Sequence, residues 1–179
     1  MLTLLGIPGA LRQASTNRLL LAEARRAFGD AHHTEADLNL PLYDEDLENS
    51  SGIPQSVQTL ADQITAADAV IIATPEYNKS LPGVLKNALD WVSRTKGSPF
   101  LNKPTAIISA ADGRAGGDRA QFALRLCLIA FRPRVLPGPE VMVAESSHAF
   151  TPEGRLVDAR YTKALSDLMA QLRAEATHP

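Results

Sequence analysis

The chain has 179 residues, of which 45% are hydrophobic, 21% charged and only 5% aromatic, and its formal net charge is −2. This length suits one domain whose core needs no disulfide or metal staple. The near-neutral charge and the scarcity of aromatic rings argue against a nucleic-acid-binding module, which needs a basic surface and rings for base stacking. A single cysteine, Cys127, excludes an intramolecular disulfide and a multi-thiolate metal cluster.

Short apolar runs alternate along the chain with longer segments of helical periodicity. The clearest strand is 69–74, which is apolar on both faces, as a buried parallel strand is. The polar stretch 39–52 predicts a loop. In chain order, the expected elements are a strand at 2–7, a helix at 16–28, a strand at 32–38, a helix at 53–66, a strand at 69–74, a helix at 82–94, a strand at 104–111, a helix at 116–131, a strand at 134–144 that Pro137 and Pro139 interrupt, and a helix at 161–174.

Five successive strand–helix units with compact connections predict the fold class. Such units join through right-handed crossovers, which give a parallel sheet covered by helices on both faces. The chain shows no internal repeat, low-complexity tract or linker. We therefore expect a single α/β domain that spans residues 1–179.

Ligands of such sheets bind beyond the carboxyl ends of the strands. The loop 6–17 follows the first strand and leads into a helix, whose first N–H groups suit a phosphate. Ser15, Thr16 and Asn17 add hydroxyl and amide groups, and Arg12 adds a planar cation suited to phosphate. The alternative reading is an ordinary helix cap with a solvated Arg12.

Two common nucleotide motifs do not fit this loop. No Gly-Lys-Ser/Thr follows, so it is not a P-loop, and the third glycine of the dinucleotide fingerprint is absent. Asp37 could still act as a ribose-binding acid, which leaves a Rossmann-type NAD-binding module as an alternative.

Loops after the third and fourth strands are also rich in Gly, Pro, Ser and Asn. Residues 74–94 read TPEYNKSLPGVLKNALDWVSR, and residues 109–117 read SAADGRAGG. The segment 74–94 strongly resembles the signature of the NADPH-dependent FMN reductase family, which also contains quinone, chromate and azo-dye reductases. Gly9, Arg12, Ser15 and Asn17 match the family's first loop, and 109–117 resembles its glycine-rich flavin loop. The likeness extends over residues 2–158.

This resemblance implies a flavodoxin-like fold with strand order 2-1-3-4-5 that binds FMN non-covalently. The family has a serine where this chain has Ala10, so we expect weaker FMN retention. The implied cofactor-binding residues are Arg12, Ser15, Thr16 and Asn17 for the phosphate, Pro75, Glu76, Tyr77 and Asn78 for the ribityl chain and isoalloxazine, and Ser109, Gly113 and Gly116 for the other edge.

The implied reaction is an NAD(P)H-dependent reduction in two halves. Hydride passes from NADPH or NADH to FMN, and electrons then pass to a small acceptor such as a quinone, free flavin, azo or nitro compound, or metal oxyanion. The cofactor supplies the reactivity, so we nominate no catalytic side chain. The main alternative is a nonenzymatic FMN electron carrier of flavodoxin type.

The remaining motifs predict no second site. His32, His33, His148 and His178 have no metal-ligand spacing, and Cys127 lies in an apolar run that favours burial. The run 122–131 is apolar enough to pack against a second copy in a homodimer or homotetramer. No signal peptide or membrane span is recognisable, so we expect a soluble, cytoplasmic protein with no nucleic-acid or membrane partner.

Overall fold

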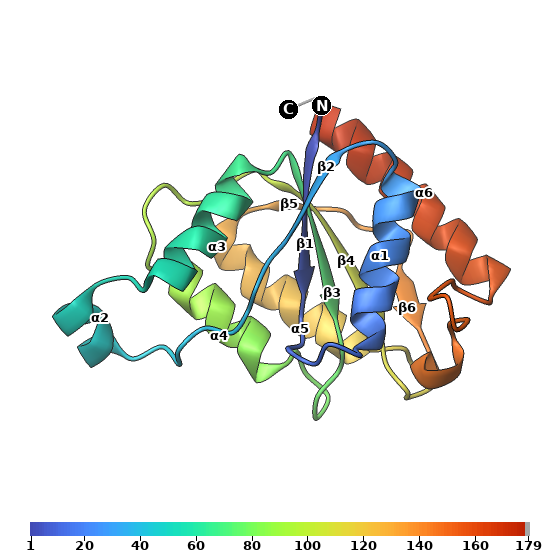
Figure 1. The fold of residues 1–179 in the computed structure, drawn as a ribbon, viewed down its shortest axis with the longest axis horizontal. Helices are drawn as coiled ribbons and strands as arrows, with labels where there is room; N and C mark the ends of the chain where they lie inside the picture. The colour runs from blue at the N-terminus through green and yellow to red at the C-terminus, as the bar shows by residue number, and fades with distance from the viewer. Residues whose placement is uncertain (178–179) are drawn as a thin grey trace.

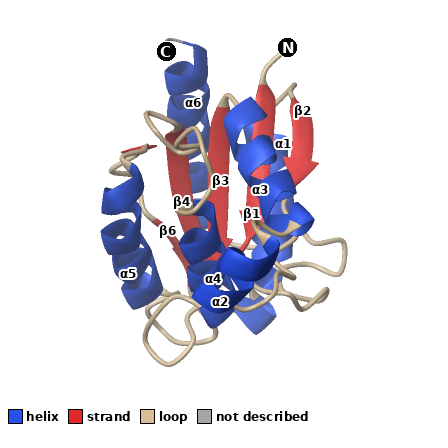
Figure 2. Ribbon diagram, turned by 90° about the vertical axis from the view of Figure 1, so that its left-hand side faces the viewer, coloured by secondary structure: helices blue, strands red, loops and turns tan. Residues whose placement is uncertain are grey.

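The third strand of the chain, β3 (Ala69–Thr74), lies at the centre of the sheet, and all of its residues are buried. The computed structural model describes residues 1–177, and its strands form one parallel sheet, seen face-on in Figure 2. Their order is β2-β1-β3-β4-β5, with β6 also paired to β4, which confirms the expected order. The other strands are β1 (Thr3–Pro8), β2 (His32–Glu35), β4 (Pro104–Ala110), β5 (Arg134–Val135) and β6 (Val141–Val143).

Helices cover both faces of this sheet, as Figure 1 shows. On one face α1 and α6 pack with Ile71 and Ala73, and on the other α3, α4 and α5 pack with Val70 and Ile72. Alternate residues of β3 thus serve two cores, and the expected α/β fold with covered faces is confirmed. The helices are α1 (Thr16–Phe28), α2 (Glu45–Ser51), α3 (Gln55–Ala66), α4 (Gly83–Val92), α5 (Asp118–Leu128), α6 (Ala159–Thr177) and the short 3₁₀ helices η1 (Ile129–Phe131) and η2 (Ser146–His148).

The expected last strand, 134–144, is divided into β5 and β6. β5 pairs with the start of β4, and β6 pairs with its end. Leu136, just after β5, and Val141, at the start of β6, accept hydrogen bonds at their carbonyl oxygens from Arg125 and Gln121 of α5, at 3.0 and 2.9 Å. Side chains of α5 therefore replace sheet hydrogen bonds around the two prolines, which cannot donate to a neighbouring strand.

The prediction of a loop at 39–52 is wrong, because α2 lies within it. Asp44 caps this helix by accepting a hydrogen bond from the N–H of Asp46, at 2.9 Å. None of the residues of α2 is buried, so it has no apolar face that periodicity could detect. The capping aspartate and the acids in the first turn were the available signals.

The second half of the 74–94 motif holds this projecting segment against α4. The indole N–H of Trp91 and the side-chain amide of Asn87 both donate to the carbonyl oxygen of Pro41, at 2.8 and 2.9 Å. The Tyr43 ring meets Trp91 edge-on, with 5.0 Å between centroids. Arg94 pairs with Glu48 of α2 at 2.9 Å. Trp91 is therefore a buried structural residue.

No helix among residues 1–177 is both long and apolar enough to cross a membrane. Within the same residues no cluster of His, Cys, Asp and Glu could hold a metal ion, and His178 lies outside them.

Candidate functional site

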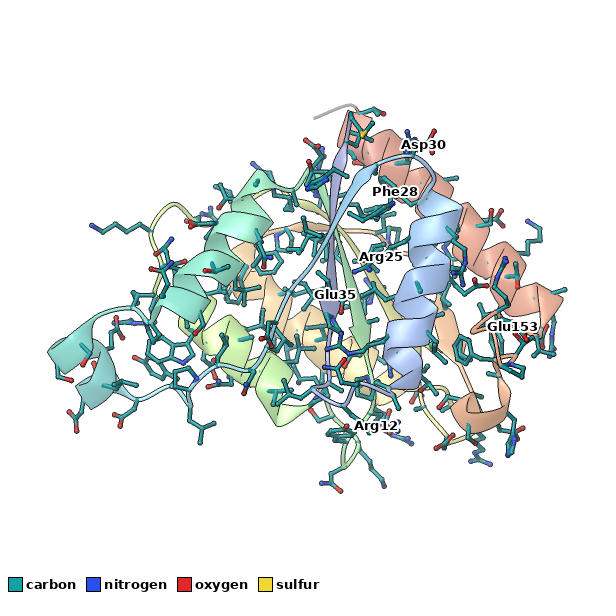
Figure 3. The ribbon with its side chains drawn as sticks, in the orientation of Figure 1. Arg12, Arg25, Phe28, Asp30, Glu35 and Glu153 are labelled. Carbon is teal, nitrogen blue, oxygen red and sulfur yellow. The ribbon has the colours of Figure 1, made fainter. Side chains whose placement is uncertain are left out.

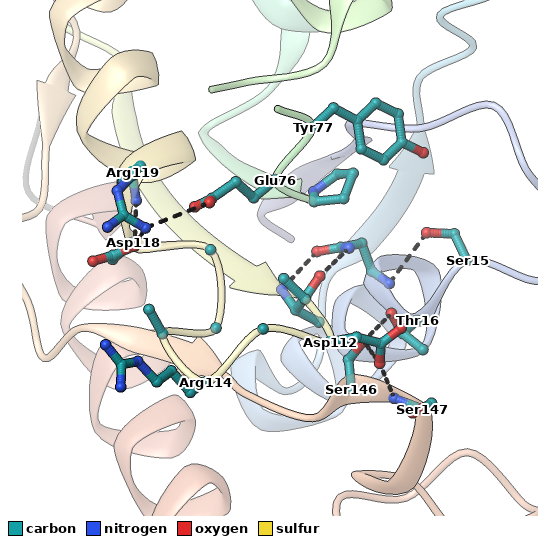
Figure 4. A pocket seen from close by; sticks show the side chains of 18 of the residues that line it. Ser15, Thr16, Glu76, Tyr77, Asp112, Arg114, Asp118, Arg119, Ser146 and Ser147 are labelled. Atoms are coloured by element: carbon teal, nitrogen blue, oxygen red, sulfur yellow. Dashed lines mark hydrogen bonds and ion pairs between the residues drawn. The ribbon is translucent and has the colours of Figure 1, made fainter. Parts of the chain in front are cut away.

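A cleft of about 960 Å³ lies at the carboxyl ends of β1, β3 and β4, where the three conspicuous loops meet (Figure 4). Its walls come from the loop before α1, the loop after β3, the glycine-rich loop after β4, the first turn of α5 and the start of η2. The topology thus brings together segments more than 100 residues apart. Asp37, the possible ribose-binding acid, is exposed beyond β2 and is absent from the cleft lining, which removes the support for a Rossmann-type NAD site.

The loop before α1 presents a hydroxyl-lined helix N-terminus. Ser15 caps the helix, because its Oγ accepts a hydrogen bond from the N–H of Asn17 at 3.3 Å. The hydroxyl of Thr16 donates to Ser146 Oγ at 3.2 Å. The side chain of Arg12 is exposed, lines the cleft and lacks any hydrogen bond or ion pair with the described residues. Figure 3 places it at the end of the molecule where the loops gather.

Asn17 lines the cleft, and its side-chain amide is also bonded to the end of β4. Its Nδ2 donates to the carbonyl oxygen of Ala110 at 2.8 Å, and its Oδ1 accepts from the Ala110 N–H at 2.9 Å. The side chain is only 1% exposed. It therefore fastens the start of α1 to the end of β4.

The loop after β3 projects as a tight hairpin. Tyr77 and Ser80 exchange both backbone hydrogen bonds, at 3.0 and 3.1 Å. Asn78 and Lys79 take positive φ angles of 51° and 65°, a conformation that asparagine tolerates better than most residues. Pro75 and Tyr77 line the cleft as expected, but Asn78 does not, because it forms the tip of the turn.

The glycine-rich loop approaches β6 so closely that a side chain would not fit. A Cβ on Gly116, where φ is +60°, would lie 2.4 Å from the carbonyl carbon of Met142. Ser109 is fully buried, donates to the carbonyl oxygen of Gly116 at 2.6 Å and accepts from Gln121 at 2.9 Å. Ser109 therefore fixes this loop and does not line the cleft, contrary to expectation, whereas Gly113 and Gly116 do line it.

Several polar residues of the cleft were not anticipated, among them Asp112, Ser146 and Ser147. The Oδ1 of Asp112 accepts hydrogen bonds from the N–H of Ser147 at 2.8 Å and from the hydroxyl of Ser146 at 3.2 Å. These bonds, that from the Ser147 backbone foremost, hold the pKa of Asp112 below its ordinary value. Asp112 stands in a recognisable Asp-Gly loop, but Ser146 and Ser147 follow β6, and only the tertiary structure brings them here.

Glu76 and Arg119 both line the cleft and form an ion pair there. One carboxylate oxygen of Glu76 lies 3.9 Å from the guanidinium of Arg119. The other is buried and has no hydrogen-bond partner among the described residues. A buried carboxylate oxygen without a donor is costly, so a ligand that offers an N–H at this point is favoured.

Ala10 is only 4% exposed and does not line the cleft. The hydroxyl of a serine at this position would therefore project from a buried Cα outside the cleft lining. The expected weaker retention of FMN remains a prediction.

Known proteins share this sequence and fold over nearly the whole chain. Residues 2–148 match the model of the NADPH-dependent FMN reductase family. An NAD(P)H-dependent FMN reductase of Pseudomonas aeruginosa is 45% identical over 95% of this chain and 91% of its own length. A quinone reductase of Escherichia coli is 38% identical over 84% of this chain and 82% of its own length. The flavoenzyme FerB of Paracoccus denitrificans, an NAD(P)H:(acceptor) oxidoreductase, superposes with a TM-score of 0.87 at 30% identity, over 99% of this chain and 98% of its own.

The family match covers most of the chain and includes all three loops that form the cleft. The chain therefore belongs to the NADPH-dependent FMN reductase family, as its motif indicated, and is an NAD(P)H-dependent oxidoreductase that uses FMN.

Proposed function

We propose that this cleft holds FMN and that the chain passes reducing equivalents from NAD(P)H to a small acceptor: a quinone, free flavin, azo or nitro compound, or metal oxyanion. The observation that carries the proposal is the meeting of three loops in one polar cleft at the carboxyl ends of the strands. Residues 1–179 would form a single FMN-binding domain for this purpose.

The helix N-terminus of α1 suits the phosphate of FMN. Arg12 supplies a cation without a carboxylate partner among the described residues, and Ser15 and Thr16 supply hydroxyl groups beside the first turn. A phosphate here would also gain from the positive end of the helix dipole. Asn17 holds this loop in place through Ala110.

The opposite part of the cleft suits the isoalloxazine ring. Pro75, Tyr77, Gly113 and Gly116 line it, and glycines allow a flat ring close approach to the backbone. The unpartnered oxygen of Glu76 matches the N–H that the pyrimidine part of a flavin carries. The residues present therefore fit the cofactor.

When bound, FMN supplies the hydride and electron chemistry. The chain's task is to hold the ring, to offer backbone N–H groups to the edge that gains negative charge, and to leave one face open. Tyr77 is the one aromatic residue that lines the cleft within residues 1–177, and its side chain is 51% exposed. An uncovered face admits flat acceptors of many kinds, which supports a broad acceptor range.

We also propose a homodimer or homotetramer that works in the cytoplasm. Phe122, Leu126 and Ile129 recur along one face of α5 and η1 and are 59%, 70% and 69% exposed. An apolar stripe of this kind on a helix favours contact with a second copy.

Flavin fluorescence and NADPH oxidation together test the function. We expect the purified chain to quench added FMN on binding, and to oxidise NADPH rapidly once a quinone is supplied. Quenching without NADPH oxidation would indicate an electron carrier, and dinucleotide binding without any flavin quenching would refute the proposal.

A further inference from the structure

Cationic side chains line the cleft on each of its three loops, with Lys79 in the hairpin after β3. Arg12 stands in the loop before α1, beside Ser15 and Thr16. Arg114 and Arg119 belong to the glycine-rich loop and the first turn of α5. In Figure 4 their guanidinium groups lie on the same side of the cleft, away from Ser15 and Thr16.

Arg119 has carboxylate partners nearby, whereas Arg114 has none among the described residues. The guanidinium of Arg119 lies 3.9 Å from carboxylate oxygens of both Glu76 and Asp118. Arg114 is exposed and has no hydrogen bond or ion pair from its side chain with any residue that the structure describes. Arg114 therefore offers an unused bidentate donor to an anion that enters the cleft.

The backbone that carries Arg114 is fixed on both sides. Before it, Asp112 is bound to Ser147 at 2.8 Å. After it, Gly116 gives its carbonyl oxygen to Ser109 at 2.6 Å, and its N–H donates to Gly113 at 3.0 Å. A short loop held at both ends loses little entropy when its side chain binds a ligand.

FMN has one phosphate, which the proposed function assigns to the Arg12 end of the cleft. Arg114, at the other end of the cleft, is then available to an anion of the other substrate. NADPH carries an additional phosphate on its adenosine ribose, at the end away from the nicotinamide. With the nicotinamide beside the flavin, that end would reach toward solvent, and Arg114 is an exposed residue of the cleft lining.

We propose that Arg114 binds the 2′-phosphate of NADPH and that the enzyme therefore prefers NADPH to NADH. The inference rests on the proposed function of the same cleft. An arginine is suited to this task, since a planar guanidinium can bind two oxygens of a terminal phosphate at once.

The test compares Arg114→Gln with Lys96→Gln, which removes the same charge from an exposed residue outside the cleft. In Arg114→Gln the ratio of kcat/KM for NADPH to that for NADH falls about tenfold, as expected for one lost charge-assisted contact. Calorimetry on the FMN-loaded proteins shows the same fall in the affinity for NADP⁺ relative to NAD⁺. Lys96→Gln leaves both ratios at their wild-type values.

Two results would overturn the inference. One is an unchanged preference in Arg114→Gln, and the other is a lost preference in Lys79→Gln but not in Arg114→Gln, because Lys79 also lines the cleft. Flavin quenching by wild type is measured first. Failure there refutes FMN binding itself, whereas normal quenching with an unchanged preference refutes only the role of Arg114.

Discussion

The side-chain amide of Asn17 and the backbone of Ala110 form a reciprocal pair of hydrogen bonds, at 2.8 and 2.9 Å, which joins two of the three loops around the cleft. An aspartate could accept from the Ala110 N–H but would place its second oxygen against the carbonyl. We expect Asn17→Asp to lose about 1–3 kcal/mol of unfolding free energy, because a buried polar group loses its partner. Urea denaturation measures this loss, with the exposed Asn49→Asp as the matched control.

A stable Asn17→Asp protein would show that this pair does not hold the loops together. If stability falls as expected, FMN affinity should fall with it, because the loop before α1, which we propose to hold the phosphate, is no longer fastened to β4.

Arg12 should matter to FMN through its phosphate alone. We expect Arg12→Ala to weaken FMN binding by about tenfold or more, while riboflavin binding changes little, because riboflavin has no phosphate. Flavin fluorescence quenching measures both affinities. An equal loss for the two flavins would place the phosphate elsewhere in the cleft.

The sequence predicted those parts of the fold that depend on local pattern. The apolar run 69–74 matches β3 residue for residue, and Ser15 marks the start of α1, because an apolar strand and a capped helix are both visible in neighbouring residues. Helix α2 was not predicted, since it has no buried residue and is held in place by distant residues: Arg94 pairs with Glu48, and Trp91 binds the segment before the helix.

In the site, too, features set by neighbouring residues were predictable and features set by distant residues were not. Sequence motifs identified the loops that line the cleft, but they did not distinguish residues that face it from residues that support it. The hydroxyl of Ser109 is bonded to Gly116 and does not line the cleft, whereas Asn17 lines the cleft while its amide is bonded to the backbone of Ala110. Ser146 carried no local signal, because its position depends on the path of the chain after β6.

The ionised side chain of Glu23 should make the free energy of unfolding depend on pH. It is 6% exposed and accepts hydrogen bonds from Arg26, Arg155 and the Leu156 N–H, which tie α1 to the segment before α6. Burial raises the pKa of Glu23, but these bonds and charges outweigh it and hold the pKa below the ordinary 4.5. The contribution is therefore complete above that value and is lost as the pH falls through the lower, folded-state pKa.

We expect Glu23→Gln to lower the unfolding free energy at neutral pH by about 1–3 kcal/mol. The difference from wild type should narrow as the pH falls below about 4.5. Urea denaturation over a pH series measures it. A difference that stays constant in acid would show that the charge of Glu23 is not what matters.

Gly116 and Gly113 provide a contrast within one loop. A Cβ on Gly116 would collide with Met142 at 2.4 Å, where φ is also positive, whereas a Cβ on Gly113 would meet no atom within 4 Å. We expect Gly116→Ala to cost about 2 kcal/mol or more, and Gly113→Ala to change stability by less than about 1 kcal/mol. Thermal unfolding of the two variants tests this; similar Tm values would mean that the loop can move away from β6.

The apolar stripe on α5 predicts the state of association. Leu126 lies between Phe122 and Ile129 and is 70% exposed, so a charge there would be buried without a partner in any interface that covers the stripe. We expect Leu126→Glu to shift the sedimentation coefficient from that of a dimer or tetramer to that of a monomer. Val157→Glu, at a position 64% exposed and outside the stripe, should leave it unchanged. A variant of Leu126 that sediments as wild type would exclude this face from the interface, because a buried, unpaired carboxylate costs more than most interfaces can tolerate.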